Sequence, residues 1–373
     1  MGLLDLGSKP LNAARRTGGA VAHLVRGHEV EPAADYGFFG PDSVAWKVWA
    51  YPTSLMVGFS RAVTVEELDP LLVASVDHSG QVKQRPYLRY DRTLQYFATV
   101  MFADAETVLK SSEILMKIHS RAIGIDPETG QQYDANDPES QLWIHLTAWH
   151  SILYAYEVYG PGRLSAEEEA RYWEDCAVAA EFQTIDPDSV PRTREGIRQY
   201  FEDYRPQLIG SEVAQDMFQF LANGALYAVP PSTPDPIAWL VNAVVSRAVI
   251  ATLPKWMREM GGTPQSRVVD IAAVTVAKPA HRVVGSSATL ERLLIGFLSP
   301  KTAAIVDPVL ANVPAINPRT YTPAEARKAF GHSQTPREIY ADILAEREHQ
   351  AGPKPYAEHH HDSVVEFAAP TAS

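Results

Sequence analysis

Apolar residues recur at steps of three and four along most of the central chain, which is the spacing of amphipathic helices. The clearest predicted helix runs to Tyr159, and Asp137, Pro138 and Glu139 supply the cap, the first-turn proline and the early acid at its start. Strand-like alternation is scarce, and its best candidate, residues 268–276, also fits a buried helix. The pattern therefore predicts an all-α protein.

Three further positions carry the sequence signals of a helix start. Ser165 and Glu168 have the spacing of a capping box. Thr322 and Thr335 are each followed by proline and, three residues later, by glutamate, so each predicts a helix, the second running through Arg347. Both of these late helices are rich in charge and are expected to be solvated.

Composition along the chain predicts four parts. Residues 1–41 form an irregular leader rich in Gly, Ala and Pro, and residues 42–318 form one helical domain. Residues 319–352 form a charged helical tail, and residues 353–373 read as disordered.

The candidate functional residues lie on two consecutive predicted helices, which are joined by a turn near residues 102–105. On the first helix, Arg89, Arg92, Thr93 and Tyr96 share one side, because three- and four-residue steps return to the same face. By itself this group fits a solvated face equally well.

The second helix places a histidine on its apolar stripe, and Gly124 is its expected C-terminal cap. The stripe consists of Val108, Ser112, Leu115, His119 and Ala122. A lone histidine on an apolar face is most often a core residue with a satisfied hydrogen bond. An all-helical haem pocket, however, needs such an imidazole on one side of the iron and polar groups on the other.

A block from about His78 to Pro206 resembles the rubber oxygenase catalytic domain, the family of latex clearing protein and of the fungal oxygenase of mycophenolic acid biosynthesis. The resemblance rests on the order and spacing of short pieces. These are His78-Ser79, Arg89-x-x-Arg92-Thr93, Phe102-x-Asp104, Met116-x-x-His119, Tyr133-x-Ala135-x-Asp137-Pro138-Glu139, Leu142-Trp143-Ile144-His145, Ala155-Tyr156-Glu157, and Leu164-Ser165 through Tyr172-Trp173.

The resemblance implies a globin-like helical core, with additional N- and C-terminal helices, that binds haem b non-covalently. It implies His119 as the axial iron ligand, and Arg89, Arg92 and Thr93 on the opposite side, where dioxygen is activated. Tyr96 shares that face, and His78, just before the helix, is expected to line the pocket from a loop. The implied reaction is oxidative cleavage or oxygenation of an apolar, isoprenoid- or lipid-like substrate.

The sequence departs from latex clearing protein at Arg92, where a lysine is expected. Arginine cannot deprotonate, so it could hold dioxygen or a carboxylate but could not ligate iron as a neutral amine can. No residue clearly matches the carboxylate proposed as a base in the rubber enzyme. Rubber itself is therefore not the expected substrate.

His145 competes with His119 for the ligand role. It faces inward on a stripe that alternates steps of three and four, whereas His150 falls off that stripe and is expected to be exposed. The resemblance favours His119, which would leave His145 as a core residue or a neighbour of the cofactor.

Composition excludes several other classes of function. A formal net charge of −12 argues against duplex nucleic acid, which needs clustered Lys and Arg. The single cysteine, Cys176, excludes an intramolecular disulfide and covalent haem attachment, and it is expected to be a buried structural thiol. The helices lack the paired histidines of a zinc site, and residues 359–361 are at most an adventitious metal site.

Residues 238–256 are the most membrane-like segment, but Asn242 and Arg247 interrupt its apolar runs. A buried core helix is the favoured interpretation, and an interfacial helix that contacts a membrane peripherally is the alternative. The first 25 residues show no signal-peptide pattern, so a cytoplasmic location is expected.

Two other functions stay open at this point: a haem-binding sensor or carrier without turnover, and a cofactor-free helical interaction protein. The sequence does not indicate the oligomeric state.

Overall fold

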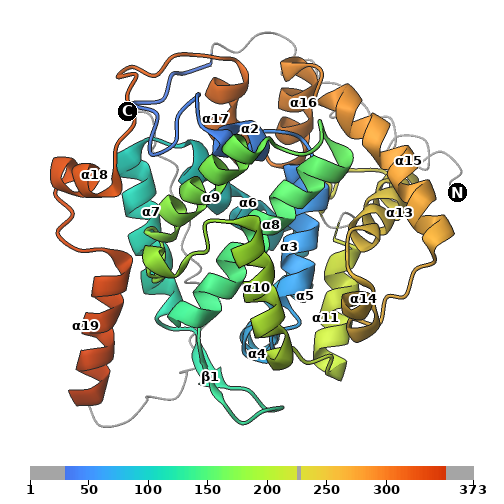
Figure 1. The fold of residues 1–373 in the computed structure, drawn as a ribbon, viewed down its shortest axis with the longest axis horizontal. Helices are drawn as coiled ribbons and strands as arrows, with labels where there is room; N and C mark the ends of the chain where they lie inside the picture. The colour runs from blue at the N-terminus through green and yellow to red at the C-terminus, as the bar shows by residue number, and fades with distance from the viewer. Residues whose placement is uncertain (1–29, 225–227, 350–373) are drawn as a thin grey trace, which may run out of the picture.

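The computed structural model describes residues 30–224 and 228–349, and Figure 1 shows that these form helices joined by short loops, with one small hairpin at the edge. The predicted all-α class is therefore confirmed. The predicted leader up to residue 29 and the predicted disordered end from residue 353, with the histidines at 359–361, lie outside the described residues.

Nine of the described elements precede or form the hairpin corner. They are α2 (Val44–Trp49), the π-helical turn η1 (Ser54–Gly58), α3 (Phe59–Glu66), α4 (Pro70–Ser79), α5 (Gln81–Gln84), α6 (Pro86–Phe102), α7 (Ala105–His119), and the hairpin strands β1 (Ile123–Ile125) and β2 (Gln132–Asp134).

The remaining elements follow the hairpin. They are α8 (Pro138–Tyr159), α9 (Ala166–Ala180), the 3₁₀ turn η2 (Pro187–Ser189), α10 (Arg194–Tyr204), the 3₁₀ turn η3 (Arg205–Gln207), α11 (Glu212–Ala222), α13 (Asp235–Ala251), α14 (Lys255–Met260), α15 (Arg267–Val284), α16 (Ala288–Leu298), α17 (Pro300–Leu310), α18 (Pro323–Phe330) and α19 (Pro336–His349).

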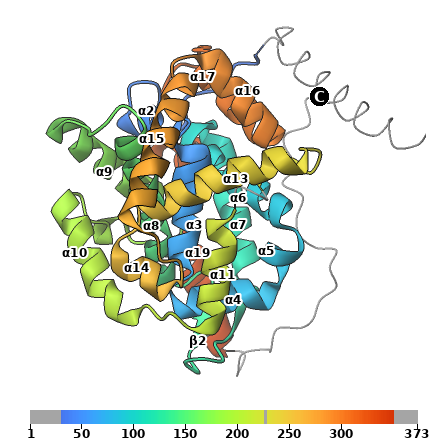
Figure 2. The same cartoon turned by 90° about the vertical axis from the view of Figure 1, so that its right-hand side faces the viewer.

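Helix α8 forms the centre of the core, with α3 and η1 along one side and α2, α9 and α15 also packed against it (Figures 1 and 2). Its start follows the sequence prediction: the Asp137 carboxylate accepts hydrogen bonds from the backbone N–H groups of Glu139 and Ser140, at 3.0 and 2.9 Å. Trp143 and Tyr159 are completely buried. The helix is therefore held by core packing on most of its circumference.

The corner after α7 differs from the prediction. The helix ends at His119 with Ser120 as its cap, and Gly124 lies in β1, paired with Tyr133 of β2. A Cβ atom at position 124 would overlap the Tyr133 side chain. Gly124 is therefore required by the close approach across the hairpin and not by a helix end.

Two apolar segments also differ from their predictions. Residues 268–276, the strand candidate, lie within helix α15, and their apolar side chains are largely exposed, so neither a strand nor a buried helix is correct. Residues 238–256 are divided between α13 and α14 by a break before Pro254. The N-terminal half of α13 is exposed and its C-terminal half is buried, so the favoured buried helix is only half correct.

The charged tail begins its helices at the two predicted threonines, and the capping box of Thr322 with Glu325 is present. Most of their side chains are exposed, as expected, and one side of each helix packs on α7. His332 Nδ1 lies 2.5 Å from Glu113 of α7, and Arg347 pairs with Asp134 at 2.7 Å. These contacts attach the tail to the corner that contains His119.

Candidate active site

The turn between α6 and α7 brings the two predicted site helices together. Phe102 ends α6, Asp104 accepts from the Thr107 N–H at 3.0 Å, and α7 begins at Ala105, as the sequence predicted. Because the chain reverses here, the beginning of α6 and the end of α7 lie at the same end of the pair. Arg89 and His119 are therefore neighbours in space.

His119 is half-buried at the last position of α7. Burial, and then the nearby positive charge of Arg89, lower the pKa of its imidazole to about 4, so the ring is neutral at neutral pH. Its Nδ1 atom lies 3.3 Å from the Gln141 side-chain nitrogen, and Nε2 makes no hydrogen bond within the described chain. A neutral ring with one nitrogen unengaged has the chemistry of a metal ligand.

Gln141 links this ring to the following loop, because its side-chain nitrogen also donates to the Ala135 carbonyl oxygen. Iron ligation through Nε2 would place the proton on Nδ1. The Gln141 amide would then have to turn its oxygen toward His119, at the cost of the bond to Ala135. Gln141 is thus the residue that would select the ring tautomer.

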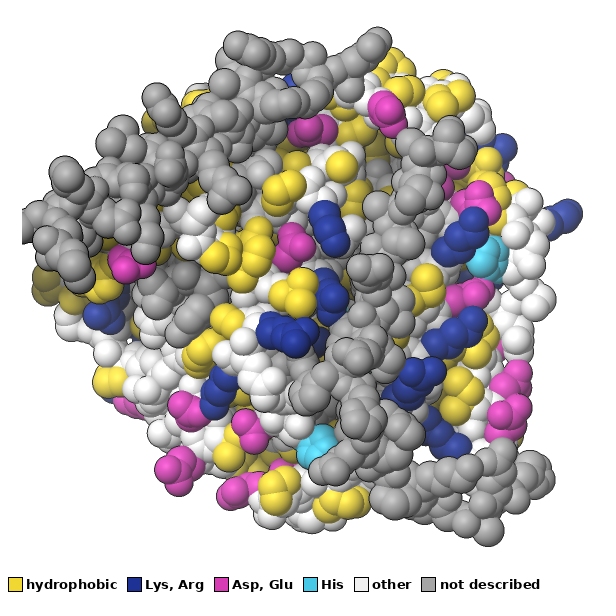
Figure 3. Space-filling view, turned by 180° about the vertical axis from the view of Figure 1, so that it is seen from behind, with side chains coloured by type: hydrophobic (Ala, Val, Ile, Leu, Met, Phe, Trp, Pro, Cys, Tyr) yellow, Lys and Arg dark blue, Asp and Glu magenta, His cyan; other side chains and the backbone are white. Residues whose placement is uncertain are grey.

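Arg89 lies between the histidine and a group of carboxyls. Desolvation, and to a smaller extent the neighbouring Arg92, lower the pKa of its guanidinium, while Glu67 and Glu66 act in the opposite direction. The residue as a whole is exposed. Figure 3 shows the face opposite that of Figure 1, on which Lys and Arg side chains gather in groups among hydrophobic ones.

Glu66 and Glu67, at the end of α3, are site residues that the sequence analysis missed. Burial raises the pKa of Glu66 to about 8 and that of Glu67 well above its usual range, and their mutual repulsion adds to the shift at Glu67. Glu67 Oε2 is buried with no hydrogen-bond partner in the described chain. In the sequence, two glutamates before Asp69-Pro70 look like an ordinary polar helix end, and only packing shows that they are enclosed.

The other predicted residues of α6 divide between two environments. Arg92 is half-buried and close enough to Arg89 to affect its pKa, and the Thr93 hydroxyl donates to the Arg89 carbonyl oxygen at 2.9 Å. Tyr96 is instead buried in the core, where its hydroxyl donates to the Phe182 carbonyl oxygen at 3.4 Å. Arg89, Arg92 and Thr93 therefore lie together, whereas the Tyr96 hydroxyl points to another part of the core.

An arginine on a helix surface commonly pairs with a nearby acid, and the nearby acids here are Asp91 and Glu113. Within the described chain, Arg92 makes no ion pair with either of them. Asp91 is buried and accepts from the Ser299 hydroxyl at 2.5 Å, and Glu113 contacts His332.

The other histidines occupy different positions. His145 is buried, with Nε2 2.8 Å from the Cys176 carbonyl oxygen, which engages that nitrogen as a donor. Cys176 is itself buried, as predicted. His78 lies in the last turn of α4 and is exposed, so it is not in the loop where it was expected.

His150 was expected to be exposed, and this is wrong: it is half-buried, beside Arg61 of α3. Arg61 is itself buried and donates to the Ser151 hydroxyl at 2.6 Å. Burial and the charges of Arg61 and Arg194 lower the pKa of His150 well below its usual range. The error arises because a second helix, α3, covers a side of α8 that the stripe alone assigned to solvent.

Two cavities lie elsewhere in the described chain. An open one of about 390 Å³ is lined by residues of α11, α13 and the 262–264 turn, among them Gln219, Asn242 and Arg247. A narrow apolar one of about 30 Å³ lies against the far side of α6, between Trp49, Phe97 and Ile295, with Glu291 as its only acid. Burial raises the pKa of Glu291 to about 7. This space holds little more than a water molecule, so a substrate could enter it only if side chains moved.

The comparison with protein families decides the classification. The family described as "ER-bound oxygenase mpaB/B'/Rubber oxygenase, catalytic domain" matches residues 46–284, which is more than half of the 373 residues. The chain belongs to this oxygenase family. The match extends beyond the block 78–206 on both sides and includes Glu66, Glu67, Arg89 and His119. Neither the curated proteins nor the solved structures provide a significant match.

Proposed function

We propose that this oxygenase-family protein uses haem b and dioxygen to oxygenate, or to cleave at a double bond, an apolar isoprenoid- or lipid-like substrate. The observation that carries the proposal is the juxtaposition of a neutral imidazole, His119, with the charged Arg89 at one end of α6 and α7, inside the family match. Haem, when bound, would supply the activation of dioxygen.

The residues present fit a haem in its ligand chemistry. His119 offers one uncharged nitrogen, and the described chain contains no group of three or more His, Cys, Asp or Glu residues that could hold a bare metal ion. A haem iron needs only one protein ligand, because the porphyrin supplies four others. His119 would hold the iron, and Arg89, Arg92 and Thr93 would face the reacting oxygen.

The remaining groups would control charge and protons. The guanidinium groups of Arg89 and Arg92 are fixed positive charges that stabilise negative charge developing on oxygen. Glu67, whose pKa burial raises, is a carboxyl beside Arg89 that can hold a proton and release it from its carboxyl oxygen.

The pyridine haemochrome spectrum of the protein expressed with haem precursor tests this proposal. We expect the spectrum of protohaem and oxygen consumption that depends on an added isoprenoid alkene. Haem without oxygen consumption for any apolar alkene would favour a sensor or carrier. A protein with no haem band would refute haem-dependent oxygenation and leave the interaction-protein alternative.

Arg92→Ala should retain haem but lose most of the oxygen consumption, roughly 100-fold if the guanidinium acts on developing charge. Arg92→Lys should recover part of the rate, because the charge is kept and the fork is lost. Haem content per protein and oxygen-electrode rates measure both effects. The exposed Lys117→Ala on α7 is the control, and equal rates for Arg92→Ala and this control would remove Arg92 from the site.

The Glu67 carboxyl should make stability depend on pH. Its pKa is raised in the folded protein, so folding favours the protonated form, and this stability is lost as pH rises above the unfolded value near 4.3. Between pH 5 and pH 8 the unfolding free energy of the wild type should therefore fall more steeply than that of Glu67→Gln. Guanidinium chloride unfolding at both pH values measures the slopes. Glu128→Gln, on the exposed hairpin turn, should keep the wild-type slope, and an unchanged slope in Glu67→Gln would contradict burial of the acid.

A further inference from the structure

Helix α15 presents an apolar face to solvent. Val268, Ile271, Val276 and Val283 are 76%, 59%, 56% and 61% exposed. With 3.6 residues per turn, the four positions fall within an arc of about 140° on one side of the helix. Its buried residues, Ala273 and Ala277, lie on the opposite side. An ordinary surface helix has the reverse pattern, with its large apolar residues turned inward.

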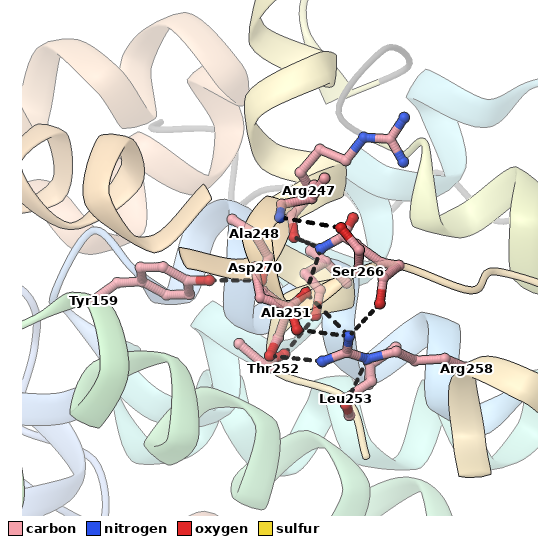
Figure 4. Close-up of polar contacts among 12 residues, drawn as sticks. Tyr159, Arg247, Ala248, Ala251, Thr252, Leu253, Arg258, Ser266 and Asp270 are labelled. Carbon is pink, nitrogen blue, oxygen red and sulfur yellow. Dashed lines mark hydrogen bonds and ion pairs between the residues drawn. The ribbon is translucent and has the colours of Figure 1, made fainter. Parts of the chain in front are cut away.

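Polar contacts on the inner side hold α15 in this orientation. Figure 4 shows Asp270 of α15 turned toward Arg258 of α14, whose Nη1 donates to both carboxylate oxygens at 3.0 and 2.9 Å. Arg258 also donates to the carbonyl oxygens of Leu253 and Ala251 at the end of α13, at 2.8 and 3.1 Å. Exposure of the apolar face is therefore built into the fold and is not the result of a loosely attached helix.

The charge on α15 is opposite to that of the whole chain. The chain carries a formal net charge of −12, yet the only acid of α15, Asp270, is bound to Arg258 on the inner side. Arg267 is exposed and Lys278 is half-exposed, whereas Arg282 is turned to the protein and donates from Nε to the Gly160 carbonyl oxygen at 3.2 Å. The outer side of α15 thus combines apolar surface with uncompensated positive charge.

Helix α13 extends this surface. Figure 2 shows α13 and α15 lying across the side of the molecule nearest the viewer, and the two helices pack against each other. Ile237, Trp239 and Leu240, in the first two turns of α13, are 54%, 68% and 60% exposed. Apolar side chains with a tryptophan and flanking cations are the composition of helices that lie in a membrane interface.

We propose that the outer side of α15, together with the first turns of α13, docks on the surface of a bilayer that contains anionic lipids. The apolar side chains would enter the headgroup region, and Arg267 and Lys278 would contact lipid phosphates. No helix in the described ranges is long and apolar enough to cross a membrane, so the contact is interfacial. The proposal does not depend on haem.

Sedimentation with vesicles tests the docking surface. The full chain should sediment with phosphatidylcholine vesicles that contain phosphatidylserine, and more weakly with phosphatidylcholine alone. Ile271→Glu should reduce this binding about tenfold or more, because an apolar contact is replaced by a charge that anionic lipid repels. The double variant Arg267→Gln, Lys278→Gln should lose only the additional vesicle binding that phosphatidylserine provides, and this additional binding should fall roughly tenfold. Its binding to phosphatidylcholine alone should be unchanged.

Ile125→Glu on β1 is the matched control, since Ile125 is 62% exposed and the substitution is the same. It should leave vesicle binding unchanged. The proposal is overturned if the wild type does not sediment with either vesicle, or if Ile125→Glu weakens binding as much as Ile271→Glu. A wild-type dimer that Ile271→Glu dissociates, without vesicle binding, would show that a second copy covers the face. Haem content, measured on the same samples, should be equal in all variants, which separates this test from that of the oxygenase.

Discussion

His119→Ala should lose haem while the protein stays folded. Changes to groups that merely support a metal ligand already lower affinity about 10- to 100-fold, so removal of the ligand itself should lower it by more than about 100-fold. Alanine is well tolerated at the end of α7, where His119 is only half-buried. The Soret absorbance per protein and the far-UV circular dichroism spectrum measure the two expectations.

His145→Ala is the control, because His145 is the competing histidine. It should destabilise the fold, since the Cys176 carbonyl oxygen would lose its donor in the core, but the folded fraction should keep its haem. If His145→Ala loses haem while His119→Ala keeps it, the ligand assignment is wrong.

Arg258→Ala should lower the unfolding free energy by about 3–5 kcal/mol, the usual effect of leaving one partner of a buried ion pair uncompensated. The Arg258 and Asp270 side chains are only 12% and 22% exposed. The substitution also leaves the carbonyl oxygens at the end of α13 without their charged donor. Guanidinium chloride unfolding measures the change.

Lys255→Ala tests the same helix at its surface. Lys255 pairs with Glu259 at 3.4 Å, but its side chain is 90% exposed, so the substitution should change stability by less than about 0.5 kcal/mol. If Arg258→Ala and Lys255→Ala lower the unfolding free energy by similar amounts, the Arg258 contacts do not hold α13, α14 and α15 together.

The sequence by itself determined the helical class, most helix starts and the family. Helix caps are local, because Asp137 and Ser165 each bond to backbone groups two or three residues further on, and short-range spacing suffices to read them. The turn at Asp104 is equally local. The sequence predicted the two helices and the turn, but that Arg89 lies beside His119 depends on the packing of α6 on α7.

Only the tertiary structure decided which polar residues are enclosed and which apolar residues are not. Glu67 is buried because α3 packs on α8, and His145 has a core partner because α9 brings Cys176 to it. The apolar face of α15 points outward because its single acid is bound to Arg258 on another helix. Each of these outcomes depends on residues far apart in the chain. Helical periodicity indicates which side chains share a face, but it does not indicate whether that face meets the core or the solvent.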